Sequence, residues 1–259
     1  MKQEYISVRS NRYLGNVYYL MSLASRSIAV SAKPGQFIHI RCSQNNVPLI
    51  RRPFSIHSVM SQKGTFEILY EVKGTGTGIL SGKKPGDTVD VIGPLGNGFD
   101  IKKAKEKSPP LLVGGGMGIA PLLFLAQALA RHDATVLIGA KTTKQILCEK
   151  DFKDVCRFVN IATDDKSAGF GGYVSDLLKK EIFPLKSRPS VIYACGPHAL
   201  LKKVAKLAKQ YKIECQVSLE TFFTCGVGAC LGCAVKTIYG YRLACKDGPI
   251  FNAEEVLWE

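Results

Sequence analysis

The chain of 259 residues lacks the segments that mark exported and membrane proteins. Its opening residues, MKQEYISVRS, contain no apolar core of the kind that a signal peptide needs, which predicts a cytoplasmic protein. An uncharged run at residues 109–130 holds three consecutive glycines followed by a proline. We therefore expect a strand, a glycine-rich turn and a helix there, and no membrane span.

Acidic residues are few in this chain. Lys and Arg number 35 against 21 Asp and Glu, which gives a formal net charge of +14. Such a charge favours an anionic partner: nucleic acid, the phosphates of a dinucleotide or an acidic protein face. Nucleic-acid-binding modules often interleave aromatic and basic residues on a strand face, and that pattern is not evident. The histidines show no ligand spacing and are expected to be structural or exposed: His39, His57, His132 and His198.

The hydrophobic pattern divides the chain into three regions. Residues 1–100 contain short runs with a two-residue period, such as Phe66 to Val72, and close Pro-Gly turns, which predict a small antiparallel β-barrel. Residues 101–217 open on a charged linker, 101–110, and then alternate strands with helices, which predicts a parallel sheet covered by helices. Residues 218–259 form a small cysteine- and glycine-rich domain with a hairpin in VKTIYGYRLAC.

In the central region, the expected strands are Leu111–Val113, Ala134–Gly139, Arg157–Ala162, Val191–Ala194 and Ile213–Val217. The expected helices are Pro121–Arg131, Tyr173–Ile182 and His198–Tyr211. The last helix carries lysines opposite an apolar stripe, which favours a solvated face over a nucleic-acid patch.

Four cysteines in the last region have the spacing of a metal cluster. Cys225, Cys230, Cys233 and Cys245 read C-x4-C-x2-C-x11-C, and the first three match the plant-type [2Fe–2S] pattern. Intervening glycines let backbone N–H groups approach the sulfurs. The alternatives are buried free thiols or a Zn(Cys)4 site, although zinc ribbons usually show two C-x2-C knuckles and only one is present. The other cysteines are expected in the core: Cys42, Cys148, Cys156, Cys195 and Cys215.

Two glycine-containing turns follow predicted strands of the central region. Gly116 to Pro121 reads G-x-G-x-x-P, where glycines let a pyrophosphate approach and the next helix offers N–H donors. Cys195-Gly196-Pro197 is a second turn, and open α/β sheets bind ligands at such strand ends. Each pattern is also compatible with a tight structural turn.

A cation, an aromatic ring and a hydroxyl stand together in the first region, in the segment R-P-F-S. Arg52 is suited to a phosphate, Phe54 to packing on a flat ring and Ser55 to a hydrogen bond with the ring edge. An ordinary strand end with a solvent-facing arginine is the alternative. Gly74 to Gly78, reading G-T-G-T-G, is either a phosphate-binding turn or a flexible loop.

The order of these motifs resembles the ferredoxin-reductase superfamily. The C-terminal cysteines narrow the likeness to the electron-transfer subunits of NAD-dependent (class 1B) dihydroorotate dehydrogenase, over essentially the whole chain and most specifically in SLETFFTCGVGACLGCAVKT. The resemblance implies an FAD site at Arg52, Pro53, Phe54, Ser55, Leu69, Tyr70, Glu71, Gly76 and Thr77. It implies a nicotinamide-nucleotide site at Gly116, Gly118, Pro121, Cys195, Gly196 and Pro197, and cluster ligands at Cys225, Cys230, Cys233 and Cys245. Many superfamily members have tyrosine in place of Phe54, so one hydroxyl is missing from this flavin contact.

The resemblance also implies a reaction sequence in pyrimidine (UMP) biosynthesis. Dihydroorotate is oxidised on a separate FMN-containing subunit, and electrons pass singly through the cluster to FAD and then to NAD+. Nicotinamide exchanges hydride and the cluster single electrons, whereas a flavin does both, so no side chain needs to act as a strong acid or base and we name no catalytic residue. The resemblance further implies a heterotetramer with two copies of each subunit.

Two other functions stay open at this stage. One is an FAD/[2Fe–2S] NAD(P)H reductase subunit for another acceptor, such as an oxygenase, a ferredoxin or a sulfur-reducing partner. The other is a zinc-stabilised nucleic-acid-binding module. NADP is not excluded either, because Lys141 and Lys144 stand near the expected site of an adenosine 2′-phosphate and no acidic residue typical of NAD selection is evident there.

Overall fold

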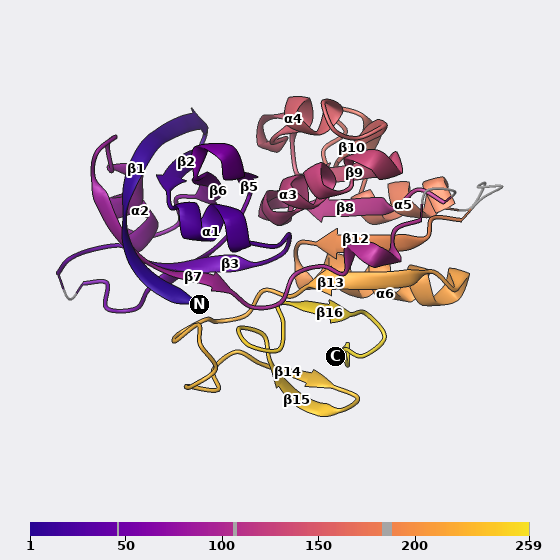
Figure 1. The fold of residues 1–259 in the computed structure, drawn as a ribbon. Coiled ribbons are helices and arrows are strands. Elements are labelled where there is room, and N and C mark those ends of the chain that lie inside the picture. The colour runs from indigo at the N-terminus through magenta and orange to yellow at the C-terminus, as the bar shows by residue number, and fades with distance from the viewer. Residues whose placement is uncertain (46, 106–107, 183–187, 259) are drawn as a thin grey trace.

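The computed structural model describes residues 1–45, 47–105, 108–182 and 188–258, which form two seven-stranded sheets and a two-stranded hairpin (Figure 1). The N-terminal sheet and the central sheet stand side by side, and the C-terminal tail lies against both (Figure 1).

The N-terminal sheet is antiparallel, in the order β4-β3-β7-β1-β2-β6-β5. Its strands are β1 (Lys2–Gly15), β2 (Tyr18–Ala24), β3 (Phe37–Arg41), β4 (Arg52–Ser55), β5 (Ser58–Met60), β6 (Thr65–Glu71) and β7 (Thr88–Leu95). Strand β6 confirms the predicted alternation, because Phe66, Ile68 and Tyr70 are buried in the core of this sheet. The sheet curls until the Phe54 ring of β4 lies 5.7 Å from the Tyr70 ring of β6, so the predicted barrel is a half-barrel with β4 and β5 at its two ends.

Short helices connect these strands: α1 (Arg26–Ser31), the 3₁₀ turn η1 (Ser61–Lys63) and α2 (Thr75–Ser81). Helix α2 differs from the turn or loop expected at Gly74 to Gly78. The Thr77 Oγ1 atom accepts hydrogen bonds from the backbone N–H groups of Lys73 (2.9 Å) and Gly74 (3.2 Å), so a side chain caps the segment and offsets its poor helix propensity.

The central sheet has the order β11-β10-β9-β8-β12-β13-β16 and is parallel except at β16. Its strands are β8 (Leu111–Gly115), β9 (Thr135–Ala140), β10 (Phe158–Thr163), β11 (Phe170–Gly171), β12 (Val191–Cys195), β13 (Glu214–Ser218) and β16 (Ile250–Asn252). The helices and 3₁₀ turns of this region are η2 (Ile101–Lys103), η3 (Gly116–Ile119), α3 (Ala120–Ala128), η4 (Ala130–His132), η5 (Thr143–Gln145), α4 (Glu149–Lys153), α5 (Val174–Ile182) and α6 (His198–Tyr211). All five predicted strands and three predicted helices are confirmed within a few residues of their expected ends.

Helix α6 buries Leu201, Val204 and Ala208 and leaves its lysines exposed, as the apolar stripe predicts. The predicted linker at 101–110 includes residues 106–107, which lie outside the described residues; the remainder begins with η2. Across residues 1–45, 47–105, 108–182 and 188–258, no helix is long and apolar enough to cross a membrane.

The tail contains the predicted hairpin, β14 (Ala234–Thr237) paired with β15 (Gly240–Leu243). It then adds β16 antiparallel to β13, at the edge of the central sheet. This addition was not predicted, because three residues carry too short a period to reveal a strand. The tail therefore shares a sheet and a core with the central region.

The half-barrel and the central region also make direct contact. Phe124 of α3 belongs to the half-barrel core, and the ring of His57, which is 1% exposed, has its Nδ1 atom 2.6 Å from the Ala120 carbonyl oxygen. The His57 contact joins the turn between β4 and β5 to Ala120, the first residue of α3.

Candidate cofactor sites

The cysteine loop directs backbone N–H groups at sulfur atoms. Cys225 Sγ accepts hydrogen bonds from the N–H groups of Val227 (3.5 Å), Ala229 (3.3 Å) and Cys230 (3.4 Å). Cys245 Sγ accepts one from Gly228 at 3.1 Å. Such donors stabilise thiolates, which are the form that ligates iron.

The four sulfurs are free thiols, and those of Cys233 and Cys245 lie 3.2 Å apart. Burial acts to raise the pKa of Cys225, but the backbone donors outweigh it and lower the pKa to about 6. Burial and the neighbouring Cys233 raise the pKa of Cys245 to about 12 in the absence of iron. Cys233 Sγ accepts a hydrogen bond from the Cys245 N–H group at 3.4 Å, so backbone donors reach three of the four sulfurs, as suits [2Fe–2S] ligands. The structure brings the Cys233 and Cys245 sulfurs together, but among the described residues no three or more ligand side chains are gathered closely enough to hold a metal ion.

Strand β3 supports this loop on the outer face of the half-barrel. The Phe37 ring stacks on the Phe223 ring, with centroids 4.8 Å apart and planes 7° apart. The next outward residue, His39, is fully buried, and a Cβ atom added to Gly226 would lie 2.5 Å from its Nδ1 atom. Burial lowers the pKa of His39, because it disfavours the charged form of the ring.

The flavin strand predicted from R-P-F-S is β4, which pairs with β3. Its Arg52 approaches the first turn of α2, since a Cβ atom on Gly76 would lie 3.4 Å from the Arg52 Nε atom. The structure therefore brings together two of the predicted phosphate-binding elements, which are distant in the sequence. Thr77 also lies in this turn, with its hydroxyl hydrogen-bonded to the backbone.

The predicted flavin residues of β6 face different surroundings. Tyr70 packs beside Phe54 and donates its hydroxyl proton to Asn11 Oδ1 at 2.9 Å, whereas Leu69 packs toward the central region. Glu71 forms an ion pair with Lys73 at 2.9 Å.

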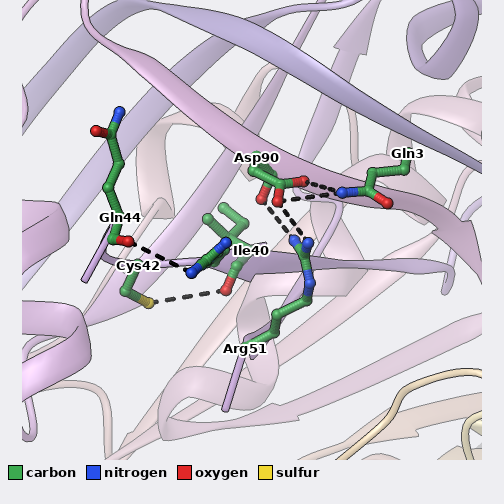
Figure 2. Close-up of polar contacts among 7 residues, drawn as sticks. Gln3, Ile40, Cys42, Gln44, Arg51 and Asp90 are labelled. Carbon is green, nitrogen blue, oxygen red and sulfur yellow. Dashed lines mark hydrogen bonds and ion pairs between the residues drawn. The ribbon is translucent and has the colours of Figure 1, made fainter. Parts of the chain in front are cut away.

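An ion pair anchors the segment that precedes the flavin strand (Figure 2). Arg51 Nη2 lies 2.5 Å from Asp90 Oδ2, and Arg51 Nη1 donates to the Asp90 carbonyl oxygen at 2.9 Å. Gln3 donates to both carboxylate oxygens, so β1 and the segment before β4 converge on a carboxylate of β7 whose side chain is 7% exposed. Arg51 is thus used structurally. Arg52 Nη1 donates to the carbonyl oxygens of Ile50 (2.6 Å) and Arg51 (3.3 Å), which holds its guanidinium beside α2 as the candidate phosphate ligand.

The two predicted nucleotide turns touch each other. A Cβ atom on Gly118 would lie 2.3 Å from the Cys195 carbonyl oxygen and 2.5 Å from the Gly196 Cα atom. Both turns lie at the carboxyl ends of adjacent parallel strands, β8 and β12, and Pro121 and Pro197 stand where α3 and α6 begin. Open α/β sheets bind nucleotides at such a point.

Sequence reasoning missed two carboxylates at the same sheet edge. The backbone N–H groups of Asp164 and Asp165 donate to the carbonyl oxygens of Ala140 (3.0 Å) and Lys141 (3.2 Å). The aspartates follow β10, which neighbours β9, so they stand beside Lys141. Aligning the carboxyl ends of β9 and β10 in the sequence would have shown that these aspartates follow one strand where Lys141 follows the other.

Three family models match successive parts of the chain. Residues 16–99 match an oxidoreductase FAD-binding domain, residues 112–206 an oxidoreductase NAD-binding domain, and residues 220–257 the iron-sulfur cluster binding domain of dihydroorotate dehydrogenase B. A protein of Desulforamulus reducens named "Dihydroorotate dehydrogenase B (NAD(+)), electron transfer subunit" is 43% identical, over 94% of each chain. The chain belongs to this family of electron transfer subunits. A Geobacillus kaustophilus protein of the same name is 36% identical, over 98% of each chain.

Solved structures share the fold. One, described as "Insights into flavin-based electron bifurcation via the NADH-dependent reduced ferredoxin-NADP oxidoreductase structure", has a TM-score of 0.87 and 32% identity, over 98% of this chain and 90% of that one. A ferredoxin reductase in carbazole 1,9a-dioxygenase has a TM-score of 0.66 at 19% identity, over 82% of this chain and 66% of that one.

As a member of this family, the protein is an electron-transfer subunit of an NAD-dependent flavin oxidoreductase, with FAD, a [2Fe–2S] cluster and NAD as its redox groups. The residues that hold each group are proposed below.

Proposed function

We propose that this chain links dihydroorotate oxidation on an FMN-containing partner subunit to NAD+ reduction, in the cytoplasm and in the service of UMP synthesis. When bound, a [2Fe–2S] cluster carries single electrons, FAD converts them to pairs, and NAD+ takes a pair as hydride. The contribution of the chain is to hold these groups in order and to exclude water between them.

The position of β3 between the flavin strand and the cysteine loop carries this proposal. Phe37 lies opposite Ser55 in the β3–β4 register, so both side chains point to the same face of the sheet. On that face Phe37 stacks on Phe223, two residues before Cys225. This arrangement supports neighbouring positions for the candidate flavin edge and the candidate cluster, as electron transfer requires.

The residues that we propose to bind the cluster, FAD and the nicotinamide nucleotide are those of the sequence motifs. The cluster ligands are Cys225, Cys230, Cys233 and Cys245. FAD contacts are Arg52, Pro53, Phe54, Ser55, Leu69, Tyr70, Glu71, Gly76 and Thr77. The nicotinamide nucleotide lies on Gly116, Gly118, Pro121, Cys195, Gly196 and Pro197. We assign the three functions to residues 1–100, 101–217 and 218–259, with β16 of the last segment completing the central sheet.

The partner subunit docks over the cysteine loop in this proposal. Large apolar side chains around the cysteines are exposed: Phe222 at 89%, Leu231 at 64% and Val227 at 39%. Cys230 is exposed among them. Apolar groups of this size at the surface indicate a protein interface, and docking there gives the partner the shortest route to the cluster. We propose two copies of each subunit in the complex.

A second function is favoured by the likeness to the NADH-dependent reduced ferredoxin-NADP oxidoreductase structure, which covers almost the whole chain. In that case the chain serves another acceptor with the same redox groups. The substrate of the partner subunit distinguishes the two functions.

The test is dihydroorotate-dependent NAD+ reduction under anaerobic conditions, with this chain and its candidate partner together and with each alone. Reduction only in the pair supports the dihydroorotate assignment. If the pair is inactive while NADH still bleaches the flavin of this chain, the dihydroorotate assignment is wrong and a reductase for another acceptor is supported. A colourless protein with one bound zinc would overturn both functions.

A further inference from the structure

The buried histidine of β3 has no role in the function proposed above. His39 is 0% exposed, and neither ring nitrogen makes a hydrogen bond of good geometry within the described part of the chain. The backbone of Phe223 and Cys225 on the cysteine loop, and of Arg51 before the flavin strand, is close enough to interact with the ring. Buried polar groups are normally well paired, so an imidazole with such imperfect partners needs a reason. The other buried histidine, His57, has its Nδ1 atom 2.6 Å from a carbonyl oxygen.

The ring of His39 lies directly beneath the cysteine loop. Gly226 has a φ of +72° and stands so close that a Cβ atom would come within 2.5 Å of Nδ1 and 3.2 Å of Cε1 and Cγ. The Nδ1 edge of the imidazole is therefore covered by the backbone that follows Cys225. The Phe37–Phe223 stack holds the same loop, two residues before His39 on β3 and three residues before Gly226 in the loop.

The flavin strand, β4, lies next to His39 in the sheet. His39 pairs with Pro53 in the β3–β4 register, and proline has no N–H group to donate. The neighbouring β3–β7 pairing contains a register shift between Phe37 and His39, an irregularity that re-aims side chains in sheets. The imidazole thus lies under the cysteine loop, on the strand that pairs with the one assigned to the flavin.

We propose that His39 is a positioning residue that seats the cysteine loop on the flavin strand, with Gly226 as the residue that makes room for it. The inference rests on the proposed cluster ligands. Because residues just outside a metal site orient its ligands and tune its potential, the role concerns the geometry and electronic state of the site rather than folding alone.

The test places alanine at either of two loop glycines, in the wild-type protein and in a His39→Ala variant. Gly226→Ala and Gly228→Ala both place a side chain at positive φ, +72° and +81°, but only the first meets the imidazole; the second meets the flexible side chain of Lys246. We expect Gly226→Ala to release iron to a chelator on the order of 10-fold faster than Gly228→Ala, as changes to such supporting residues do. In a His39→Ala background the added methyl has room, so the two substitutions should become equivalent.

Single substitutions at His39 test the role independently. His39→Ala should change the electron paramagnetic resonance signal and the midpoint potential of the reduced cluster, and His39→Asn, which restores an amide near the position of Nδ1, should recover part of both changes. FAD content and flavin reduction by NADH should stay at wild-type levels. His132→Ala, in η4, is the matched control.

The outcomes separate the two proposals. If wild-type protein holds no iron–sulfur cluster, the proposed function fails. If it does, a spectrum and potential that are unchanged in His39→Ala, or a Gly226–Gly228 difference that persists without the imidazole, would overturn the positioning role alone. Thermal unfolding of every variant checks that the fold is intact.

Discussion

The contact between the two nucleotide turns makes Gly118→Ala a sharp test of the nucleotide site. The added methyl would lie 2.3 Å from the Cys195 carbonyl oxygen, 2.4 Å from its carbonyl carbon and 2.5 Å from the Gly196 Cα atom. Non-bonded carbon atoms prefer about 3.5–4.0 Å, so the two turns must separate by roughly 1 Å. All three clashing atoms belong to the backbone, and no side-chain rotation relieves the clash.

A displacement of this size at a hydride-transfer site costs on the order of 100-fold in rate. We expect kcat/KM for flavin reduction by NADH to fall by about that factor, measured anaerobically by stopped-flow absorbance. FAD content and the cluster signal should be unchanged, because the substituted residue lies outside both sites.

Gly86→Ala is the comparison variant, because Gly86 lies outside the proposed sites and a methyl there meets nothing within 4 Å. Its φ of +94° gives a backbone cost of about 1–2 kcal/mol, which should appear mainly in thermal stability. Wild-type flavin reduction in Gly118→Ala, or an equal loss in both variants, would refute the steric argument.

Three further predictions follow from buried or activated groups. Arg51→Met leaves the Asp90 carboxylate buried without its cation and should lower the free energy of unfolding by about 3–5 kcal/mol, measured by denaturant unfolding. Adding Asp90→Asn to this variant should recover part of the loss. An unchanged free energy of unfolding in Arg51→Met would contradict a stabilising buried pair. His57→Leu removes the contact with the Ala120 carbonyl oxygen and should cost about 1–3 kcal/mol by the same measurement, whereas a neutral effect would argue that this contact is dispensable. After chelation of the iron, Cys225 should be alkylated rapidly at pH 7, because its pKa is lowered to about 6. The alkylation rate, followed by peptide mass mapping, should fall as the pH drops below 6. A rate that does not fall would contradict the lowered pKa.

Local sequence patterns were enough to predict most of the secondary structure. The apolar stripe of α6 and the alternation in β6 depend on residues within a few positions of one another, so they can be recognised without knowledge of the fold. Helix α2 was not predicted, because its glycines disfavour a helix and the cap from Thr77 depends on the folded turn. Strand β16 was not predicted, because it exists only by pairing with β13.

The sequence by itself determined the chemistry of this protein: the cysteine spacing, the R-P-F-S segment and the glycine turns, in their order along the chain, carry the resemblance to its family. Only the tertiary structure decided which of these elements meet. Alternation in β3 assigns Phe37 and His39 to one face, yet it cannot say that a loop almost 190 positions later covers that face. Likewise Gly118 appears in the sequence as a turn residue, and the backbone of Cys195 that requires it to be glycine comes from another strand of the sheet. Close packing between distant segments fixes such contacts, and no local pattern encodes them.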